Sequence, residues 1–443
     1  MIFSVSDRRK RILGLALPIV GGMFSQNILN LIDTAMVGSL GSPALAAVGL
    51  GAFATFMSQS ILLGLSSGVQ TMAARRRGEG RSFESAIYLN GALIVALFLG
   101  LFLSFLLSPH VEELFQLLNS DPAVQKQGVP YLSVRMFGIP FIAMNMSFRG
   151  YWNAMDLSKV YMRTLIVMHL SNVALNYVLI FGHFGFEPMG TQGAGIATVF
   201  AQMLGTLIYF STAFSQEKKH GFLKGVPNRD DFKTLLKLCI PMGIQQFFFS
   251  SGYTTLYWII GKIGTIELAA ANVLLNVMLI AILPSMAMGI ASTTLVSQAI
   301  GEREIEQAKK WPGEVILTGL PLLIFLGALL VFVPEWILHF FLKDTETLEV
   351  AKVPMQIAGI TIWMDLLAMV YMNSLLGAGE SAKVMKTSIV LQWILFLPLA
   401  YFVGPYLGGG LVGVWTAQAV YRMIQMFGFS WIWKSGSWET VKI

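Results

Sequence analysis

The sequence predicts an all-α integral membrane protein with about twelve transmembrane helices, arranged as two six-helix lobes related by an internal repeat. Three observations support this fold class: the hydropathy of the chain, the distribution of its basic residues and the recurrence of short motifs at a constant offset. Of the 443 residues, 55% are hydrophobic and 12% are charged. Soluble domains carry about 25% charged residues, so the composition favours a protein whose surface faces lipid.

Long apolar runs alternate with short polar stretches along the chain. Only helices and closed barrels satisfy the backbone inside a bilayer, and runs of about 20 residues or more suit helices. The first run follows a basic stretch at residues 8–11 and lacks a small-residue cleavage site, so we expect a retained helix and not a signal peptide. The expected spans are residues 12–38, 44–74, 84–108, 124–149, 159–182, 191–214, 236–261, 267–298, 314–341, 352–376, 384–406 and 409–433.

The basic residues predict the orientation of these spans. If the N-terminus is cytoplasmic, the loops on that side hold most of the Lys and Arg residues. These include the arginines at 75–77 and the basic residues between 218 and 237. Arg422 is assigned to the same side. The opposite loops hold only Lys126, Lys262, Lys343 and Lys352. This alternation follows the positive-inside rule and explains the net charge of +6 without a nucleic-acid partner. We expect a multi-pass protein of the cell inner (plasma) membrane with both termini in the cytoplasm.

The two halves of the chain are repeats. The offset between Pro18 and Pro241 recurs, because the same offset places Gly38 on Gly261 and Gly78-Glu79 on Gly301-Glu302. We therefore divide the chain into an N-lobe (residues 1–215), a cytoplasmic linker (216–237) and a C-lobe (238–443). Each lobe has six helices and thus the same orientation, which predicts a pseudo-twofold axis along the membrane normal and a substrate cavity between the lobes. This architecture is typical of transporters.

Two acidic residues lie deep in expected spans: Asp33 in the first and Asp365 in the tenth. A charge inside the bilayer costs about 2.5–3.5 kcal/mol on insertion scales and indicates function by default. An apolar environment disfavours an ionised carboxylate, so such a group can take up a proton on one side and release it on the other, or pair with a cation. Competition between proton and substrate for one carboxylate would produce exchange. A structural, hydrogen-bonded role remains the alternative for both residues.

Other polar residues accompany these acids. Asn172 and Asn176 are spaced i, i+4 and share one helix face, and Asn30 lies three residues before Asp33 on its face. Hydrogen bonds between helices explain Asn172 and Asn176 as well as a binding role does. His169 could relay protons, but a lone histidine on a helix is more often structural. Pro18 can kink the first helix and is a candidate hinge.

Several functional classes lack their motifs. The sequence contains no P-loop for ATP, no His-Glu-x-x-His or Cys-x-x-Cys pair for a metal, and a single cysteine, Cys239. We expect a protein that is not an enzyme and needs no cofactor.

The sequence resembles the multidrug and toxic compound extrusion family over essentially its whole length. The resemblance is carried by the six-plus-six repeat and by the motifs Leu31–Gly38, Gly193–Thr198 and Gly377–Glu380. It implies antiport of H⁺ or Na⁺ against lipophilic organic cations. Asp33 matches the coupling carboxylate of the family's N-lobe, and Asn172, Asn176 and Thr198 match polar positions of the same site, which could bind Na⁺.

Two positions favour H⁺ over Na⁺ within this resemblance. Some branches of the family carry a second carboxylate where Asn176 stands, and its absence here weakens a Na⁺ site in the N-lobe. Asp365 matches an acid that a Na⁺-coupled branch uses in its C-lobe, but Phe249 occupies the place of the partner glutamate. We therefore expect H⁺ as the coupling ion, with Na⁺ as the alternative.

Other functions stay open at this point. A lipid-linked oligosaccharide flippase of the same superfamily would need basic residues in its cavity, and Arg135 is the one strong candidate. A membrane scaffold would need neither the repeat nor Asp33, and an intramembrane enzyme would need an acid/base or metal constellation. For the transporter, the expected partners are small lipophilic cations and the bilayer, and the expected state is a monomer.

Overall fold

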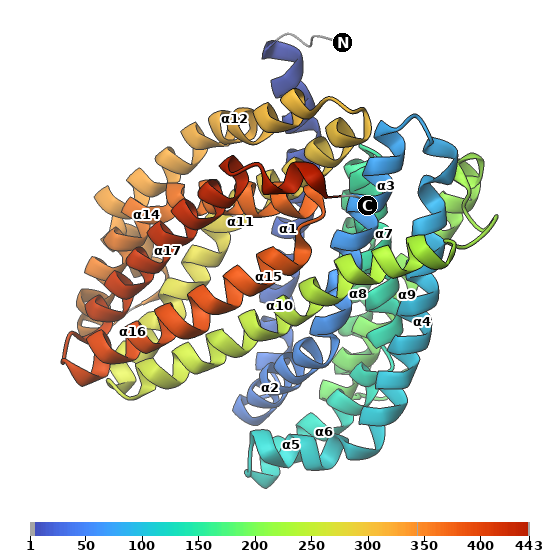
Figure 1. The fold of residues 1–443 in the computed structure, drawn as a ribbon. Helices are drawn as coiled ribbons and strands as arrows, with labels where there is room; N and C mark the ends of the chain where they lie inside the picture. Colours follow the sequence, from blue (N-terminus) through green and yellow to red (C-terminus); the bar gives the residue numbers. More distant parts are fainter. Residues whose placement is uncertain (1–4, 343, 442–443) are drawn as a thin grey trace. The chain divides into compact units, whose positions relative to one another are not determined.

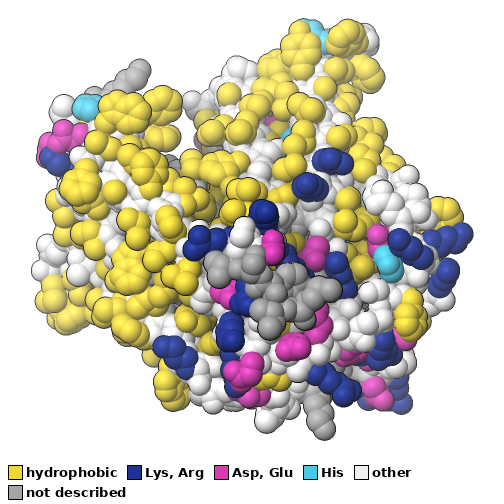
Figure 2. Space-filling model, turned by 90° about the horizontal axis from the view of Figure 1, so that it is seen from above, with side chains coloured by type: hydrophobic (Ala, Val, Ile, Leu, Met, Phe, Trp, Pro, Cys, Tyr) yellow, Lys and Arg dark blue, Asp and Glu magenta, His cyan; other side chains and the backbone are white. Residues whose placement is uncertain are grey.

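The computed structural model describes residues 5–342 and 344–441, so Lys343 lies outside the described residues. The described chain consists of helices and short connections and has no strand (Figure 1). This confirms the all-α prediction. Hydrophobic side chains cover broad areas of the face shown in Figure 2, whereas charged side chains gather in patches. Large apolar residues such as Phe98, Phe105 and Leu170 are more than half exposed, as expected for a surface in contact with lipid.

The helices of the N-terminal half lie close to the expected spans, except that the expected single span 124–149 is two helices, the first ending at Met136 and the second starting at Ile139. Short 3₁₀ turns join several of them, so that α2 continues through η1 into α3. The elements are α1 (Val5–Gly38), α2 (Ser42–Gln59), η1 (Ser60–Leu63), α3 (Gly64–Gly78), η2 (Ser82–Glu84), α4 (Ser85–Leu107), η3 (Ser108–His110), α5 (Val111–Leu118), α6 (Pro122–Met136), α7 (Ile139–Ala154), α8 (Ser158–Phe181) and α9 (Gly190–Gln216).

The C-terminal half contains the corresponding helices. They are η4 (Lys218–His220), α10 (Arg229–Gly261), α11 (Thr265–Gly301), α12 (Ile305–Phe332), α13 (Pro334–Phe341), α14 (Thr345–Ala378), α15 (Ser381–Ile389), η5 (Val390–Phe396), α16 (Leu397–Tyr401), η6 (Phe402–Tyr406), α17 (Gly410–Lys434) and η7 (Ser437–Thr440). The expected single span at 314–341 is in fact two helices. Pro334 cannot donate a backbone hydrogen bond, so α12 ends before it and α13 starts on it.

Nine helical segments of the described chain are long and apolar enough to cross a membrane. Three further helical segments have a similar length but contain more polar residues: α6 together with α7 as one segment, then α10, and then α17. Counted with the nine, they correspond to the twelve spans that the sequence predicts, six in each half of the described chain.

The repeat extends further than the sequence motifs show. The short helices α5 and α13 have the same length, and their first residues, Val111 and Pro334, are separated by the offset that relates Pro18 to Pro241. Asp121 and Asp344 have the same separation, and each caps the helix that follows. Asp121 accepts a hydrogen bond from the Ala123 amide (2.8 Å), and Asp344 accepts one from the Thr347 amide (2.9 Å). The connection between the third and fourth spans is thus built alike in both halves.

The chain forms two compact units that divide inside helices. One unit is Gly21–Gly243; the other joins the residues up to Val20 to those from Ile244 onward. The two division points lie at repeat-related positions inside α1 and α10, and each comes two residues after a proline (Pro18 and Pro241) through which the helix continues. The first turns of α1 therefore pack with the C-terminal helices: Arg8 pairs with Glu314 of α12.

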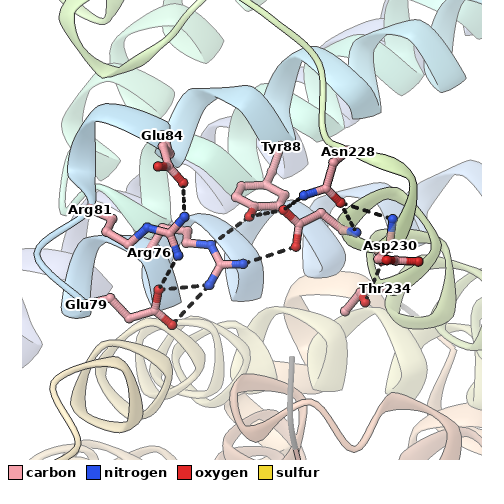
Figure 3. A network of polar contacts seen from close by, with 9 residues as sticks. Arg76, Glu79, Arg81, Glu84, Tyr88, Asn228, Asp230 and Thr234 are labelled. Atoms are coloured by element: carbon pink, nitrogen blue, oxygen red, sulfur yellow. Dashed lines mark hydrogen bonds and ion pairs between the residues drawn. The ribbon is translucent and has the colours of Figure 1, made fainter.

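The start of α10 packs within the unit Gly21–Gly243 in the same manner. Cys239 lies against Gly68 of α3, where any side chain would collide with its thiol. Arg76 of α3 bonds the hydroxyl of Tyr88 (2.6 Å) and pairs with Asp231 of α10 (3.2 Å) (Figure 3). Tyr88 in turn donates to Asp231 (3.1 Å).

The segment between α9 and α10 is docked on the same unit. Asn90 of α4 donates to the carbonyls of Gly221 (3.0 Å) and Gly225 (2.7 Å) and accepts from the Leu223 amide (3.2 Å). Phe222 is buried. One side chain thus satisfies three backbone groups of this connection.

Asn90→Ala is expected to loosen this connection. The substitution removes three hydrogen bonds and leaves the buried Gly221 carbonyl without this partner; an unsatisfied buried group costs about 1–3 kcal/mol. We expect faster tryptic cleavage after the exposed Lys224, measured by limited proteolysis of the purified protein. Gln216→Ala, at an exposed position nearby, serves as the control. Equal cleavage of the Asn90→Ala variant and the wild type would show that Asn90 does not hold the segment.

Candidate functional site

Asp33 of α1 meets polar residues of α8 and α9 in the unit Gly21–Gly243. Asn176 donates from Nδ2 to Asp33 Oδ1 at 2.6 Å. With its amide nitrogen toward Asp33, Asn172 donates to the same oxygen at 3.0 Å, and its carbonyl accepts from the Thr198 amide at 3.2 Å. Both asparagines are 1% exposed. The structure thus brings together four of the predicted site residues.

Local sequence features explain how three helices reach one point. The i, i+4 spacing of Asn172 and Asn176 directs both amides to one face of α8. Gly193 lets α9 approach α8, because a side chain there would collide with the backbone of Leu179 at 2.7–2.8 Å. The glycine motif that opens α9 therefore has a packing role that places Thr198 next to Asn172.

A second group of polar residues continues along α1 and α8. The two ring nitrogens of His169 lie 2.5 Å from Ser25 Oγ and 3.1 Å from Gln26 Oε1. Gln26 Nε2 donates to Asn30 Oδ1 at 3.1 Å. Asn30 therefore bonds Gln26 and not Asp33, although it lies on the expected face. His169 has both nitrogens bonded, which is the arrangement of a structural histidine.

Arg135, at the end of α6, is the basic residue of this region. It lies close enough to Asp33 for the two charges to interact, yet no salt bridge joins them in the described structure. Arg135 is 9% exposed, and its Nε and Nη1 atoms are buried without a hydrogen-bond partner. The guanidinium carbon lies 6.0 Å from the centre of the Tyr131 ring.

The deep carboxylate of the C-terminal half has a different environment. Asp365 of α14 forms a salt bridge with Arg422 of α17, and both side chains are buried. The expectation that Arg422 lies on the cytoplasmic side is wrong, because Arg422 lies at the midpoint of α17. That central position is the signal that could have identified it. The charge of Asp365 is thus compensated within the protein.

Phe249 of α10 lies in the same compact unit as Asp365. Its ring packs against Tyr253 with ring centres 5.0 Å apart, and its carbonyl accepts a hydrogen bond from Gln392 at 3.2 Å. Asp365 and Asp33 therefore differ in kind, because a fixed cation neutralises the first and neutral amides hold the second.

No group of three or more His, Cys, Asp or Glu residues that could hold a metal ion is found among the described residues. At Asp33 the neighbouring asparagines present amide nitrogens. Each amide also carries a carbonyl oxygen, and that of Asn176 is buried without a hydrogen-bond partner in the described structure.

Comparisons with known proteins agree with this architecture. The model of the MatE family matches residues 18–178 and 241–402, two stretches that begin at the repeat-related prolines Pro18 and Pro241. The chain is similar to the probable multidrug resistance protein NorM of Thermotoga maritima (27% identity; 98% of this chain and 94% of that protein). It is also similar to the multidrug resistance protein MdtK of Yersinia pseudotuberculosis (24% identity; 94% of each chain).

Solved structures show the same fold. An outward-facing multidrug resistance MATE family transporter of the MOP superfamily superposes with a TM-score of 0.90 (22% identity; 98% of this chain and 97% of that chain). A MOP superfamily transporter from Pyrococcus furiosus gives a TM-score of 0.88 (22% identity; 98% and 97%).

Proposed function

Since the chain belongs to the multidrug and toxic compound extrusion family of membrane transporters, we propose that it is a multidrug efflux antiporter that exchanges H⁺ for lipophilic organic cations by alternating access. The names of its relatives NorM and MdtK support multidrug export. The family is one of transporters, and we expect no resident cofactor. We also propose that the protein is a monomer of the inner (plasma) membrane. Both termini are placed in the cytoplasm because the basic loops follow the positive-inside rule.

The observation that carries the proposal is the environment of Asp33. Its carboxylate is held by two neutral amides and forms no salt bridge in the described chain. A substrate cation can therefore pair with it directly. A proton bound to the same carboxylate removes the charge that holds the substrate. Proton and substrate then bind in alternation, which is the requirement for exchange.

H⁺ is favoured over Na⁺ as the coupling ion by the groups around the two acids. Asn176 stands where some branches of the family carry a second carboxylate, so the site beside Asp33 offers a Na⁺ ion less negative charge. Asp365 has Arg422 as its fixed counter-ion and Phe249 in place of a second acid. We regard Asp33 as the site of coupling and Asp365 as a structural partner of Arg422.

The flippase alternative is disfavoured by the charges. A lipid-linked pyrophosphate carries at least two negative charges and would need several free cations. Arg135 lies within electrostatic range of the carboxylate of Asp33, and in the other compact unit Arg422 is neutralised by Asp365. This charge balance suits cations or zwitterions.

Proton movement in everted membrane vesicles tests the proposal. The vesicles are energised in Na⁺-free buffer, an organic cation such as ethidium is added, and an internal pH dye is followed. We expect proton efflux that depends on the substrate. Ethidium transport that requires added Na⁺ would establish Na⁺ coupling instead. A folded protein that shows neither proton efflux nor Na⁺-dependent ethidium transport would rule out antiport of this cation.

A further inference from the structure

We propose that a cavity between α12, α14 and α17 binds the phosphate headgroup of an anionic phospholipid, on the side that the basic residues predict to be cytoplasmic. The cavity has a volume of about 470 Å³, within the range of about 300–1,000 Å³ that is common for ligand sites. All of its lining residues belong to the segment Ile244–Ile443 of one compact unit. α14 packs against both α12 and α17 (Figure 1) and supplies Tyr371 to the lining.

The lining of the cavity carries a net positive charge, because it contains three lysines and two glutamates. Glu439 pairs with Lys309 at 3.1 Å, and Lys309 also pairs with the exposed Glu306 at 3.0 Å. Glu314 pairs with Arg8. Both glutamates of the lining are thus held by cations of the protein, which lowers their repulsion of an anion. The remaining positive charge matches the single negative charge of a phosphodiester.

Three polar groups of the lining are free to bind a phosphate. Lys310, Lys434 and Tyr371 line the cavity, and none of the three has a hydrogen bond or an ion pair within the described chain. Ammonium groups bind phosphate oxygens as point charges, and a phenol hydroxyl can donate to the same oxygens. Lys310 lies on the second turn of α12 and Lys434 is the last residue of α17. A ligand that meets both lysines therefore lies between the two helices.

Gly313 leaves space in the wall of the cavity that α12 forms. A Cβ atom at this residue would meet no other atom within 4 Å. Glycine inside a helix is destabilising relative to alanine, and the packing of the described chain gives no reason for a glycine here. Open space at this point is what a bound headgroup requires.

Tryptophan residues indicate that the cavity lies at the level of the lipid headgroups. Trp433 lines the cavity and stacks on the buried Trp438, with ring centres 4.3 Å apart. The Trp438 indole donates to the Trp433 carbonyl at 2.9 Å, which holds the segment after α17 in place. Tryptophan is enriched where membrane meets water, and basic pockets between helices at the cytoplasmic surface are suited to acidic headgroups.

Exposed apolar residues continue from each free lysine towards the middle of its helix. On α12, Leu317 and Ile324 follow Lys310 at intervals of seven residues and are 64% and 55% exposed. On α17, Phe427 precedes Lys434 by seven residues and is 62% exposed. Residues seven apart share one face of a helix. The lysines would hold the phosphate and these faces would contact the acyl chains, which favours a phospholipid over a free phosphate ion.

Native mass spectrometry of the purified full-length protein tests the site, with phosphatidylglycerol and phosphatidylcholine of the same acyl chains as probes. The wild type should bind phosphatidylglycerol about tenfold more tightly or better, because two free ammonium groups meet its charge. Lys310→Gln together with Lys434→Gln should abolish this preference. The control is Lys219→Gln together with Lys224→Gln, which removes the same charge from exposed residues between α9 and α10 and should keep the preference.

Gly313→Leu tests the cavity itself, because it fills the space and keeps every charge. We expect about tenfold weaker binding of phosphatidylglycerol. Gly49→Leu is the matched control, since Gly49 of α2 lies in the other compact unit and a Cβ atom there would also meet nothing within 4 Å. Thermal unfolding without lipid checks the fold of each variant. Added phosphatidylglycerol should raise the unfolding temperature of the wild type and the controls only.

Three outcomes would overturn the proposal. The first is equal binding of the two lipids by the wild type, and the second is an equal loss of preference in the Lys219 and Lys224 control. The third is displacement of phosphatidylglycerol by inorganic phosphate, which would show a site for the free ion. Full binding of phosphatidylglycerol by a folded Gly313→Leu variant would place the lipid outside this cavity and would also contradict the proposal. These measurements report binding alone, so they do not depend on whether the protein exchanges protons for ethidium.

Discussion

Asp33→Asn is expected to abolish substrate-driven proton efflux in a folded protein. Asparagine retains the size of the side chain but can neither release a proton nor pair with a cation. Loss of one partner of a buried charge pair costs about 2–5 kcal/mol, so substrate affinity should fall by about two orders of magnitude. The measurement is the vesicle assay in Na⁺-free buffer with ethidium, together with ethidium binding to the purified variant.

Asp230→Asn provides the matched control for this experiment. Asp230 is an exposed acid near the start of α10, and its change should leave proton efflux as in the wild type. Proton exchange at wild-type rates in Asp33→Asn would mean that another group carries the proton. The assignment of Asp33 as the coupling residue would then be wrong.

Arg422→Met is expected to destabilise the protein strongly. It leaves the buried carboxylate of Asp365 without its counter-ion, and breaking a buried pair from one side costs about 3–5 kcal/mol. Asp365→Leu should do the same by leaving Arg422 unpaired. The double variant removes both charges and is expected to be close to the wild type, because apolar replacement of both partners is often neutral or stabilising. Thermal unfolding in detergent measures all three.

The same variants test what Asp365 does. If the pair is structural, the double variant should keep its proton efflux, since Asp33 is unchanged. A stable double variant without efflux would show that Asp365 or Arg422 takes part in transport. Additive effects of the two single changes would show that their salt bridge contributes little.

The spanning helices and the Asp33 site could be predicted because their signals are local. Lipid requires long apolar runs, and the repeat fixes their number and orientation. Asn172 and Asn176 share a face by helix geometry alone, and Asp33 is conspicuous as an acid in an apolar run. The family resemblance then indicated that these residues belong to one site with Thr198.

Other features depend on contacts between distant segments and had no local signal. Asp365 and Arg422 lie on different helices. The positive-inside rule is applied to basic residues in loops, and it therefore assigns Arg422 wrongly to the cytoplasmic side. Asn30 has the right spacing to join Asp33, but Gln26 on the same helix is available as its partner. The buried, unpaired state of Arg135 depends on what packs around it and cannot be derived from its position in the sequence.

The division of α1 and α10 between the compact units bears on how such a chain could have arisen. Each unit consists of one half of the sequence without its first helical turns, plus the corresponding segment of the other half. This is the connectivity of a domain-swapped homodimer. Gene duplication and fusion of a half-length ancestor would join two such subunits without changing which segments pack together. A chain cut between η4 and α10 should therefore reassemble from two co-expressed fragments, whereas either fragment alone would lack one helix end of its unit.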